Sequence, residues 1–313
     1  MLLNIVVLIA GLVALVFAGD KLVVGAVGLA ERLRVSPLVI GLTIVAFGTS
    51  APELFVSLSA AFDGQPGLAI GNVVGSNIAN VLLVLGAPAL IHAVNCHEEG
   101  IEVSNWAMVG LTALFMVFLA TGQIGRLEAA TLFVLLIAFI AYQMHAARKG
   151  RLPAPTYDDE VDAEGLTSRG IALALIIGVI GLPLGSELTV RGASGIAAAF
   201  GVSDAVIGLT IVAIGTSLPE LVTTVTAAIR RSNEVAIGNV IGSNIFNIAS
   251  IMGITGMVIP LDVDARIVSP DMWVMAASTA LLVVLTLLKG TIGRLGGGLM
   301  LLGYAGYLAL FAA

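Results

Sequence analysis

The chain has 313 residues, of which 58% are hydrophobic and only 11% are charged. A soluble globular domain carries about 25% charged residues, so this composition excludes a soluble enzyme and predicts a polytopic membrane protein. The net charge of −6 decides little because the acids are unevenly placed, and the single cysteine excludes an intrachain disulfide.

Ten apolar stretches predict ten membrane-spanning helices, because a helix needs roughly 20 mostly apolar residues to cross a bilayer. In chain order they cover 3–33, 38–62, 67–92, 102–121, 126–146, 169–199, 204–229, 235–260, 270–288 and 293–312. The first stretch lacks the basic leading region of a signal peptide, so we interpret it as a retained span. We therefore expect an all-α integral membrane protein.

One charged linker, 147–168, separates a first unit (1–146) from a second unit (169–313). The linker contains the acidic run Tyr157–Asp162 and two prolines, which predicts a solvated loop; a regulatory calcium-binding loop is the alternative. Ten Lys and Arg side chains fall on the predicted face that carries the linker, and two fall on the opposite face. Because basic residues concentrate on the cytoplasmic side, we expect a cytoplasmic linker and both termini outside.

An internal repeat is the strongest signal in the sequence. Residues 39–80 align with 206–247 without a gap, at an offset of 167, and 26 of the 42 positions are identical. Each unit then holds five predicted spans, and because five is odd the second copy must enter the membrane from the opposite side. Inverted repeats of this kind are typical of secondary transporters, which bind their substrate near the midplane.

Two glutamates occupy matching positions in the middle of predicted spans. Glu53 and Glu220 each follow a proline, Pro52 or Pro219, in the repeated motif Gly-Thr-Ser-x-Pro-Glu. An ionisable group at that depth normally faces an interior pathway, and a bound cation would keep it ionised. A proline inside a helix kinks it and frees a backbone carbonyl that can bind a hard cation. The carbonyls freed here belong to Gly48 and Gly215.

Hydroxyl and amide side chains complete an oxygen-rich set around the glutamates. The Thr and Ser of each motif lie four and three residues before the glutamate, so they can share a helix face with it, and the next helix carries a polar stripe at i, i+4 and i+8. Oxygen ligands suit calcium or sodium, whereas zinc and copper prefer nitrogen and sulfur. The members of the set are Thr49, Ser50, Asn72, Ser76, Asn80, Thr216, Ser217, Asn239, Ser243 and Asn247. The alternative, which also applies to Asn77 and Asn244, is that these side chains only hydrogen-bond between helices.

Small residues and a second pair of acids also repeat. Gly71 with Gly75, and Gly238 with Gly242, form G-x-x-x-G patterns that predict close helix contacts. For the matching acids Asp20 and Glu187, an ion pathway and a structural ion pair are both open. The fourth residue after Glu187 is Arg191, which can neutralise it, whereas Lys21 is expected to face away from Asp20.

One cluster has no copy in the second unit. His92, Cys96 and His97 lie close together beside Glu98 and Glu99, at the predicted cytoplasmic end of the third span. Nitrogen, sulfur and carboxylate ligands at this spacing are compatible with a transition metal. Histidines are also common at membrane interfaces, and this second interpretation is the one we favour.

The two motifs, Gly48-Thr49-Ser50-Ala51-Pro52-Glu53 and the stretch from Gly71 to Asn80, with their second copies, resemble the alpha repeats of the cation/calcium antiporter superfamily. The likeness is greatest to prokaryotic sodium/calcium exchangers and extends over nearly the whole chain. It implies ion sites at the centre of the membrane, with the first and sixth helices sliding past a core of the others. The implied ligands are Glu53, Glu220, Ser50, Ser76, Ser217 and Ser243, with Thr49 and Thr216 nearby, the backbone carbonyls of Ala46 and Ala213, and Asn80 and Asn247 at the remaining corners.

Many relatives carry Asp where this chain has Asn247, and this departure argues against potassium dependence. The two glutamates supply two negative charges, which one Ca²⁺ balances, whereas three Na⁺ leave one positive charge. A three-for-one stoichiometry, as in the family, would then make exchange electrogenic.

We expect a sodium/calcium antiporter that works by alternating access. A proton/calcium antiporter is the alternative, although proton-coupled relatives typically carry a different signature around the acids. A cation channel usually builds its filter from several subunits, and a hydrolase would need a base to activate a serine, which the predicted core lacks. Inorganic cations (Ca²⁺ and Na⁺) are the expected substrates and lipid the surroundings, in a prokaryotic plasma (inner) membrane, with no cofactor, catalytic residue or nucleic-acid partner.

Overall fold

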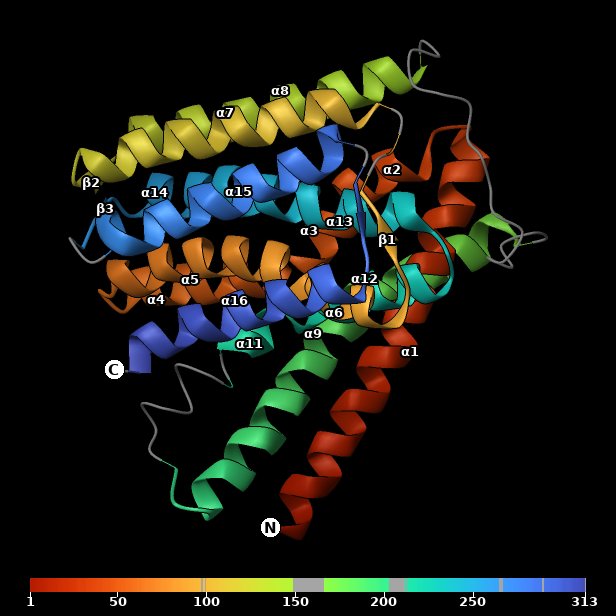
Figure 1. Cartoon of the computed structure of the whole chain (residues 1–313), viewed down its shortest axis with the longest axis horizontal. Helices are drawn as coiled ribbons and strands as arrows, with labels where there is room; N and C mark the ends of the chain where they lie inside the picture. Colours follow the sequence, from red (N-terminus) through yellow and green to blue (C-terminus); the bar gives the residue numbers. More distant parts are fainter. Residues whose placement is uncertain are drawn as a thin grey trace.

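The computed structural model describes residues 1–96, 98, 100–148, 166–202, 211, 213–264, 267–288 and 290–312. Apart from short connections and four two-residue strands, the described residues are helical (Figure 1). The predicted all-α class is confirmed. Most of the predicted linker, residues 149–165, lies outside the described residues.

In the first half of the chain the predicted second span is bent, and the predicted second and third spans each contain a π-helical turn. The helices of this half are α1 (Leu2–Leu33), α2 (Pro37–Ile40), α3 (Ala46–Thr49), α4 (Ala51–Phe62), α5 (Pro66–Ala79), α6 (Gly86–Ile91), α7 (Ile101–Ala120) and α8 (Arg126–Arg148). Two π-helical turns, η1 (Gly41–Val45) and η2 (Asn80–Val84), are inserted between α2 and α3 and between α5 and α6.

The second half repeats this order over its described residues, apart from an additional π-helical turn before α15. Its helices are α9 (Ser168–Ala199), α11 (Ala213–Thr216), α12 (Leu218–Ile229), α13 (Asn233–Phe246), α14 (Met252–Val258), α15 (Met272–Leu287) and α16 (Arg294–Ala312). The π-helical turns η4 (Asn247–Ile251) and η5 (Ile267–Asp271) precede α14 and α15.

These helical segments agree with nine of the predicted spans to within three residues at each end. The remaining one, 204–229, is helical over 213–229 except at Ser217, and its start lies outside the described residues. By length and composition, six helical stretches in the described part can cross a membrane, and the bent pair Pro37–Thr49 and Ala51–Phe62 makes a seventh.

The boundaries of the elements follow the sequence repeat. The helices α3, α4 and α5 begin and end 167 residues before α11, α12 and α13, and the turn η2 likewise precedes η4 by 167 residues. A break after Thr49 therefore recurs after Thr216, and a π-helical turn begins at both Asn80 and Asn247. The sequence motifs and the helix boundaries recur at the same offset. The motifs therefore have the same effect on local structure in both halves.

Two short antiparallel sheets connect the halves. The strand β1 (Val94–Asn95) pairs with β4 (Thr291–Ile292), and β2 (Gln123–Ile124) pairs with β3 (Leu261–Asp262). Positions in β1 and β3 match at the offset of 167. Each sheet therefore joins a connection in the first half to a connection in the second half.

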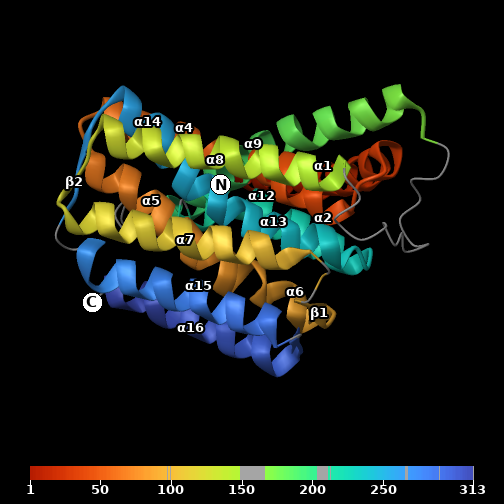
Figure 2. The ribbon, with the colours of Figure 1, turned by 90° about the horizontal axis from the view of Figure 1, so that it is seen from above.

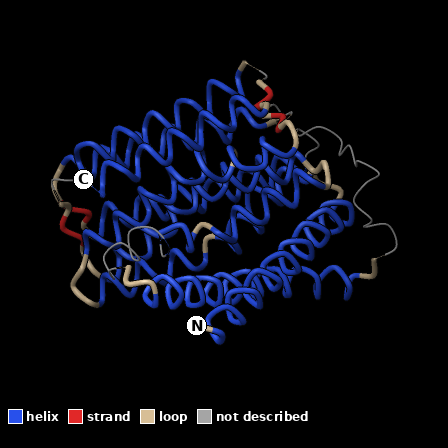
Figure 3. Tube along the Cα trace, turned by 60° about the horizontal axis from the view of Figure 1, so that its bottom comes forward, coloured by secondary structure: helices blue, strands red, loops and turns tan. Residues whose placement is uncertain are grey.

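Helices α1 and α9 lie side by side and cross the other helices at a steep angle, as Figures 1 and 3 show. Small residues allow their backbones to approach: a Cβ on Gly192 would lie 2.5 Å from Leu8 N, and one on Gly185 would lie 2.8 Å from Leu15 N. Figure 2 shows the long helices of the remainder lying roughly parallel to one another. The main apolar core lies among α5, α7, α13, α14 and α15, away from the α1–α9 pair.

The two G-x-x-x-G patterns have different surroundings. The contact predicted for the second pattern is confirmed, because a Cβ on Gly242 would lie 2.6 Å from Ala46 Cβ, and one on Gly238 would lie 2.9 Å from Leu38 O. A Cβ on Gly71 or Gly75 would meet no atom within 4 Å in the described part of the chain. Helix α13 therefore packs closely on α2, η1 and α3, whereas α5 contacts α11, and the positions that match Leu38 and Leu42 at the offset of 167 lie outside the described part.

Candidate cation site

Two helix breaks place the glutamates. The pair α2–α3 and α4 is bent by 43° at Ser50, where Pro52 occupies the start of α4, so the predicted kink is confirmed. The second copy breaks at Ser217, with Pro219 at the start of α12. Both glutamates consequently lie in the first turn of a helix, where the helix dipole favours a negative charge.

Both carboxylates are fully buried. Neither oxygen of Glu53 has a hydrogen-bond partner among the described residues. Glu220 Oε1 accepts a hydrogen bond from Ser50 Oγ at 3.0 Å, and its other oxygen has no partner in the described part. No ion pair between described residues involves either glutamate. Two buried carboxylates therefore lack a cationic partner among the described residues, and their charged form is costly unless an external cation is bound.

Four asparagines link the two halves. Asn80 Nδ2 donates to Asn244 Oδ1 at 3.1 Å, and Asn247 Nδ2 donates to Asn77 Oδ1 at 3.2 Å. The amide oxygens of Asn80 and Asn247 have no hydrogen-bond partner among the described residues. Because α12 packs on η2 and α4 packs on η4, each of these amides begins a turn that lies against the helix bearing a glutamate of the opposite half.

Two further asparagines, Asn72 and Asn239, form hydrogen bonds with the backbone carbonyls of the glutamates. Asn72 Nδ2 donates to Glu53 O at 3.1 Å and to Ser57 Oγ at 3.0 Å. In the second half, Asn239 Nδ2 donates to Glu220 O at 3.3 Å, and also to Thr224 Oγ1 at 3.0 Å. The interpretation of Asn72 and Asn239 as helix-connecting residues is the one that fits these contacts.

The predicted hydroxyls differ in their contacts. Thr49 Oγ1 lies 3.1 Å from Asn239 Oδ1 and 3.3 Å from Ser243 Oγ, so these side chains contact across the halves. Ser217 Oγ is buried without a hydrogen-bond partner among the described residues. Ser76 and Thr216 are also buried.

The two predicted carbonyl ligands are less well defined. Ala46 O accepts hydrogen bonds from Ser50 N at 3.0 Å and from Thr49 Oγ1 at 3.3 Å. Ala213 begins α11, and its side chain is outside the described part. Of the carbonyls that the prolines free, Gly215 O accepts a hydrogen bond from Ser186 Oγ of α9, at 2.5 Å. The sequence reasoning did not single out Ser186, because its counterpart in the first half is Gly19 and no repeat marks it.

The buried oxygens without a partner in the described part define the chemistry of this site. Six of the thirteen such oxygens belong to side chains predicted as ligands: Glu53 Oε1 and Oε2, Glu220 Oε2, Asn80 Oδ1, Asn247 Oδ1 and Ser217 Oγ. Carboxylate, amide and hydroxyl oxygens are the ligands that hard cations such as Ca²⁺ prefer.

The second pair of acids forms ion pairs away from this site. Arg191 pairs with Glu187, as predicted. The expectation for Lys21 is wrong, because its Nζ lies 3.7 Å from Asp20 Oδ2, and Asp20 also pairs with Arg230. The four-carbon side chain of lysine reaches back to the preceding carboxylate, which a count of helix faces does not anticipate. Both acids are thus held by cationic side chains, which favours the structural interpretation.

The cluster at the end of the third span does not form a metal site among the described residues. Cys96 is buried and His92 is exposed, while His97 and Glu99 lie outside the described part. Burial raises the pKa of the Cys96 thiol to about 12, against a lowering effect of the backbone at Ile292.

Comparison with known proteins shows a family likeness along nearly the whole chain. The family described as "Sodium/calcium exchanger protein" matches residues 3–145 and 170–313. The protein CaxA of Alkalimonas amylolytica is 38% identical over 98% of both chains, and sodium/calcium exchanger MaX1 of Methanosarcina acetivorans is 34% identical over 98% of both. A solved structure of the sodium-calcium exchanger NCX_Mj superposes with a TM-score of 0.84 and 31% identity, over 99% of this chain and 98% of that one.

Fold, buried oxygens and relatives together define an integral membrane transporter of the cation/calcium antiporter class. The chain belongs to the sodium/calcium exchanger family. Its resemblance to the prokaryotic exchangers, first seen in the two motifs, is confirmed.

Proposed function

We propose that this protein exchanges sodium for calcium across the membrane by alternating access, and that both ions use the oxygens of the central site. The observation that carries the proposal is the buried pair Glu53 and Glu220, which has no cationic partner among the described residues. The same carboxylates cannot serve both cargoes at once, so binding of one ion displaces the other.

The ligands in this proposal are those that the family resemblance implies. They are Glu53, Glu220, Ser50, Ser76, Ser217, Ser243, Asn80 and Asn247, with Thr49, Thr216, Ala46 and Ala213 completing the set. The two carboxylates balance one Ca²⁺, whereas three Na⁺ leave one excess positive charge. A three-for-one exchange is therefore electrogenic, and its rate responds to membrane voltage.

The topology in this proposal is ten helices in two inverted five-helix units, 1–146 and 169–313, joined by a cytoplasmic linker at 147–168. Both termini lie outside, in the plasma (inner) membrane of a prokaryote. Matching helix boundaries at an offset of 167 support the two units, and the excess of Lys and Arg on one face supports the orientation.

The test is uptake of radioactive calcium into proteoliposomes loaded with sodium, compared with matched vesicles that have only a pH gradient. Uptake driven by outward sodium, and lost in Glu220→Gln, supports the proposal and identifies the coupling ion. Uptake driven by the pH gradient alone would make the protein a proton/calcium antiporter. An exchange current that is indifferent to voltage would exclude the electrogenic stoichiometry.

A further inference from the structure

A three-residue chain of contacts occurs twice behind the central site. In one copy Asn247 Nδ2 donates to Asn77 Oδ1 at 3.2 Å, and Asn77 Nδ2 lies 3.9 Å from Met275 Sδ. In the other copy Asn80 Nδ2 donates to Asn244 Oδ1 at 3.1 Å, and Asn244 Nδ2 lies 3.8 Å from Met108 Sδ. The two methionines differ by the repeat offset of 167, although α7 and α15 lie outside the aligned motifs.

The orientation of an amide decides whether it can bind a cation. An asparagine side chain has one end that accepts hydrogen bonds and one end that donates them, and only the oxygen end can ligate a metal ion. Because Asn77 accepts from the NH₂ group of Asn247, the oxygen of Asn247 is left without a partner among the described residues. The same contact from Asn244 leaves the oxygen of Asn80 available.

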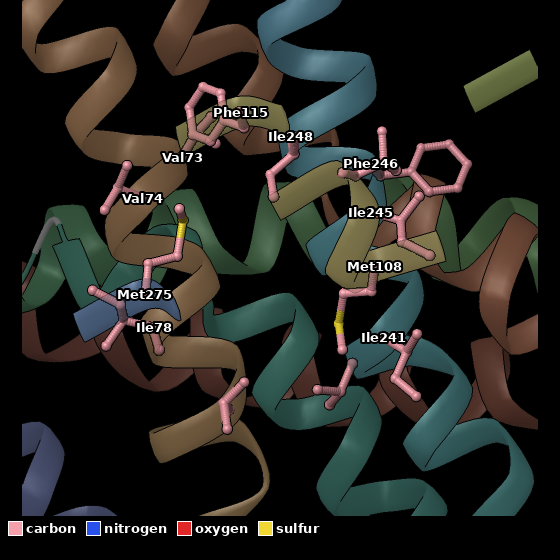
Figure 4. Close-up of a cluster of buried hydrophobic side chains, with 14 of the residues drawn as sticks. Val73, Val74, Ile78, Met108, Phe115, Ile241, Ile245, Phe246, Ile248 and Met275 are labelled. Atoms are coloured by element: carbon pink, nitrogen blue, oxygen red, sulfur yellow. The ribbon is translucent and has the colours of Figure 1, made fainter. Parts of the chain in front are cut away.

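The sulfur atoms of Met275 and Met108 favour one orientation of the Asn77 and Asn244 side chains. An amide that turned its oxygen toward a thioether would place two acceptors together, so the NH₂ end of Asn77 or Asn244 faces the sulfur. Figure 4 shows Met275 beside Val74 and Ile78 of α5, and Met108 beside Ile241 and Ile245 of α13. Both methionines and all four asparagines are at most 2% exposed, so water has little access to replace these contacts.

We propose that Asn77 and Asn244 are positioning residues of the cation site, which turn the oxygens of Asn247 and Asn80 toward the ion, and that Met275 and Met108 fix the orientation of these two residues. The inference rests on the proposed function, because it takes Asn80 and Asn247 as ligands. In this proposal each half of the chain supplies one such asparagine and one such methionine. Together they turn the oxygen of a ligand amide toward the cation and its NH₂ group away from it.

The test is a double-mutant cycle with Asn77→Ala and Asn247→Ala, read by equilibrium binding of radioactive calcium and by the KM and kcat of sodium-driven uptake. If Asn77 acts through Asn247, Asn77→Ala weakens calcium binding roughly 5- to 10-fold, the loss expected for one hydrogen bond, and adds nothing in the Asn247→Ala background. The matched control is Asn105→Ala, because Asn105 is a fully buried amide that bonds Thr286 instead of the site.

A milder pair of variants covers the case in which Asn77→Ala fails to fold. Met275→Leu keeps the volume and removes the acceptor, so calcium KM should rise roughly 2- to 3-fold with kcat unchanged, while Met252→Leu, at another fully buried methionine, leaves KM unchanged. Additive effects in the cycle, or equal effects of Met275→Leu and Met252→Leu, would overturn this inference alone. A wild-type protein that moves no calcium under either gradient would overturn the proposed function, and this inference with it.

Discussion

The hydroxyl of Ser50 donates a hydrogen bond to Glu220 Oε1 at 3.0 Å, whereas the hydroxyl of its repeat counterpart, Ser217, has no partner among the described residues. The two halves thus share a sequence motif but differ in contact at the site. Ser50 thus contributes a hydrogen bond to a carboxylate of the other half. The oxygen of Ser217 remains available for an ion.

This difference predicts unequal effects of two identical substitutions. A hydrogen bond to a charged group contributes about 1.5–3 kcal/mol, so Ser50→Ala should lower the Tm of the detergent-solubilised protein by several degrees in buffer without calcium or sodium. Ser217→Ala should leave that Tm nearly unchanged and reduce only the Tm increase on adding calcium. Thermal unfolding with and without calcium measures both. Equal shifts of the two variants in ion-free buffer would contradict the prediction.

The carboxylates give a second prediction, about transport. Removing one partner of a buried pair of opposite charges, here a glutamate and the bound cation, costs about 2–5 kcal/mol. Glu53→Gln and Glu220→Gln should therefore each weaken calcium binding by roughly 30-fold or more and abolish exchange. The control is Glu187→Gln, because Glu187 is an exposed acid of α9 that pairs with Arg191. Initial rates of calcium uptake distinguish them. Normal exchange by Glu53→Gln would remove Glu53 from the ligand set.

The glycines give a matched pair of stability predictions. Gly242→Ala places a Cβ 2.6 Å from Ala46 Cβ and 2.8 Å from Leu42 O, so the backbone must shift, and overpacking of this kind costs about 1–3 kcal/mol. Gly110→Ala, at an exposed position of α7 where a Cβ meets no described atom within 4 Å, should be tolerated. The folded fraction after purification by size exclusion and the Tm report the difference. A comparable loss in Gly110→Ala would show that the loss in Gly242→Ala does not come from its close contact with Ala46.

Much of the fold is predictable from the sequence, because hydropathy marks the spans and the offset of 167 marks the repeat. The helix break at Ser50 is predictable for the same kind of reason, since the effect of Pro52 is local. The π-helical turns at Asn80 and Asn247 are not, because nothing in hydrophobic periodicity separates them from an α-helical turn. Such turns are frequent at functional sites, and here they begin at two of the proposed ligands.

Contacts between the two halves are the part of the structure that sequence patterns do not predict. The motif predicts that Asn80 and Asn247 are polar and inward-facing, but their pairing with Asn244 and Asn77 depends on how two distant segments interlock. The same limit applies to Arg230, which lies 210 residues from Asp20 and pairs with it in the folded chain. Local spacing can only propose a neighbour such as Arg191 for Glu187.

The Asp20–Arg230 contact distinguishes the two interpretations of this acid. Both side chains are partly exposed, so the pair contributes about 1 kcal/mol or less, and Asp20→Asn should lower Tm by no more than a few degrees. Calcium exchange should persist, because Asp20 already has cationic partners and lies outside the central set of oxygens. Arg230→Gln in the Asp20→Asn background should add little further loss. Abolished exchange in Asp20→Asn would instead place this acid on the ion pathway.

The last prediction concerns the reactivity of Cys96, the only cysteine in the chain. Burial raises the pKa of its thiol from an ordinary value of 9.0 to about 12, and the nearby Glu98 acts in the same direction, against the backbone at Ile292. At pH 8 the thiolate fraction is then roughly 1000-fold lower in the folded protein than in the unfolded chain, and labelling by a maleimide should be slower by a similar factor.

The sign of the pH dependence follows from the same shift. The unfolded chain releases the thiol proton near pH 9 and the folded protein only near pH 12, so this group leaves stability unchanged below pH 9 and lowers it as pH rises from about 9 to about 12. Cys96→Ala should remove this component of alkaline destabilisation while leaving calcium exchange intact. The measurements are the maleimide labelling rate with and without denaturant, and Tm against pH for both proteins. Rapid labelling of the folded protein at pH 8 would show that the β1–β4 connection opens, and that Cys96 is not held as the structure places it.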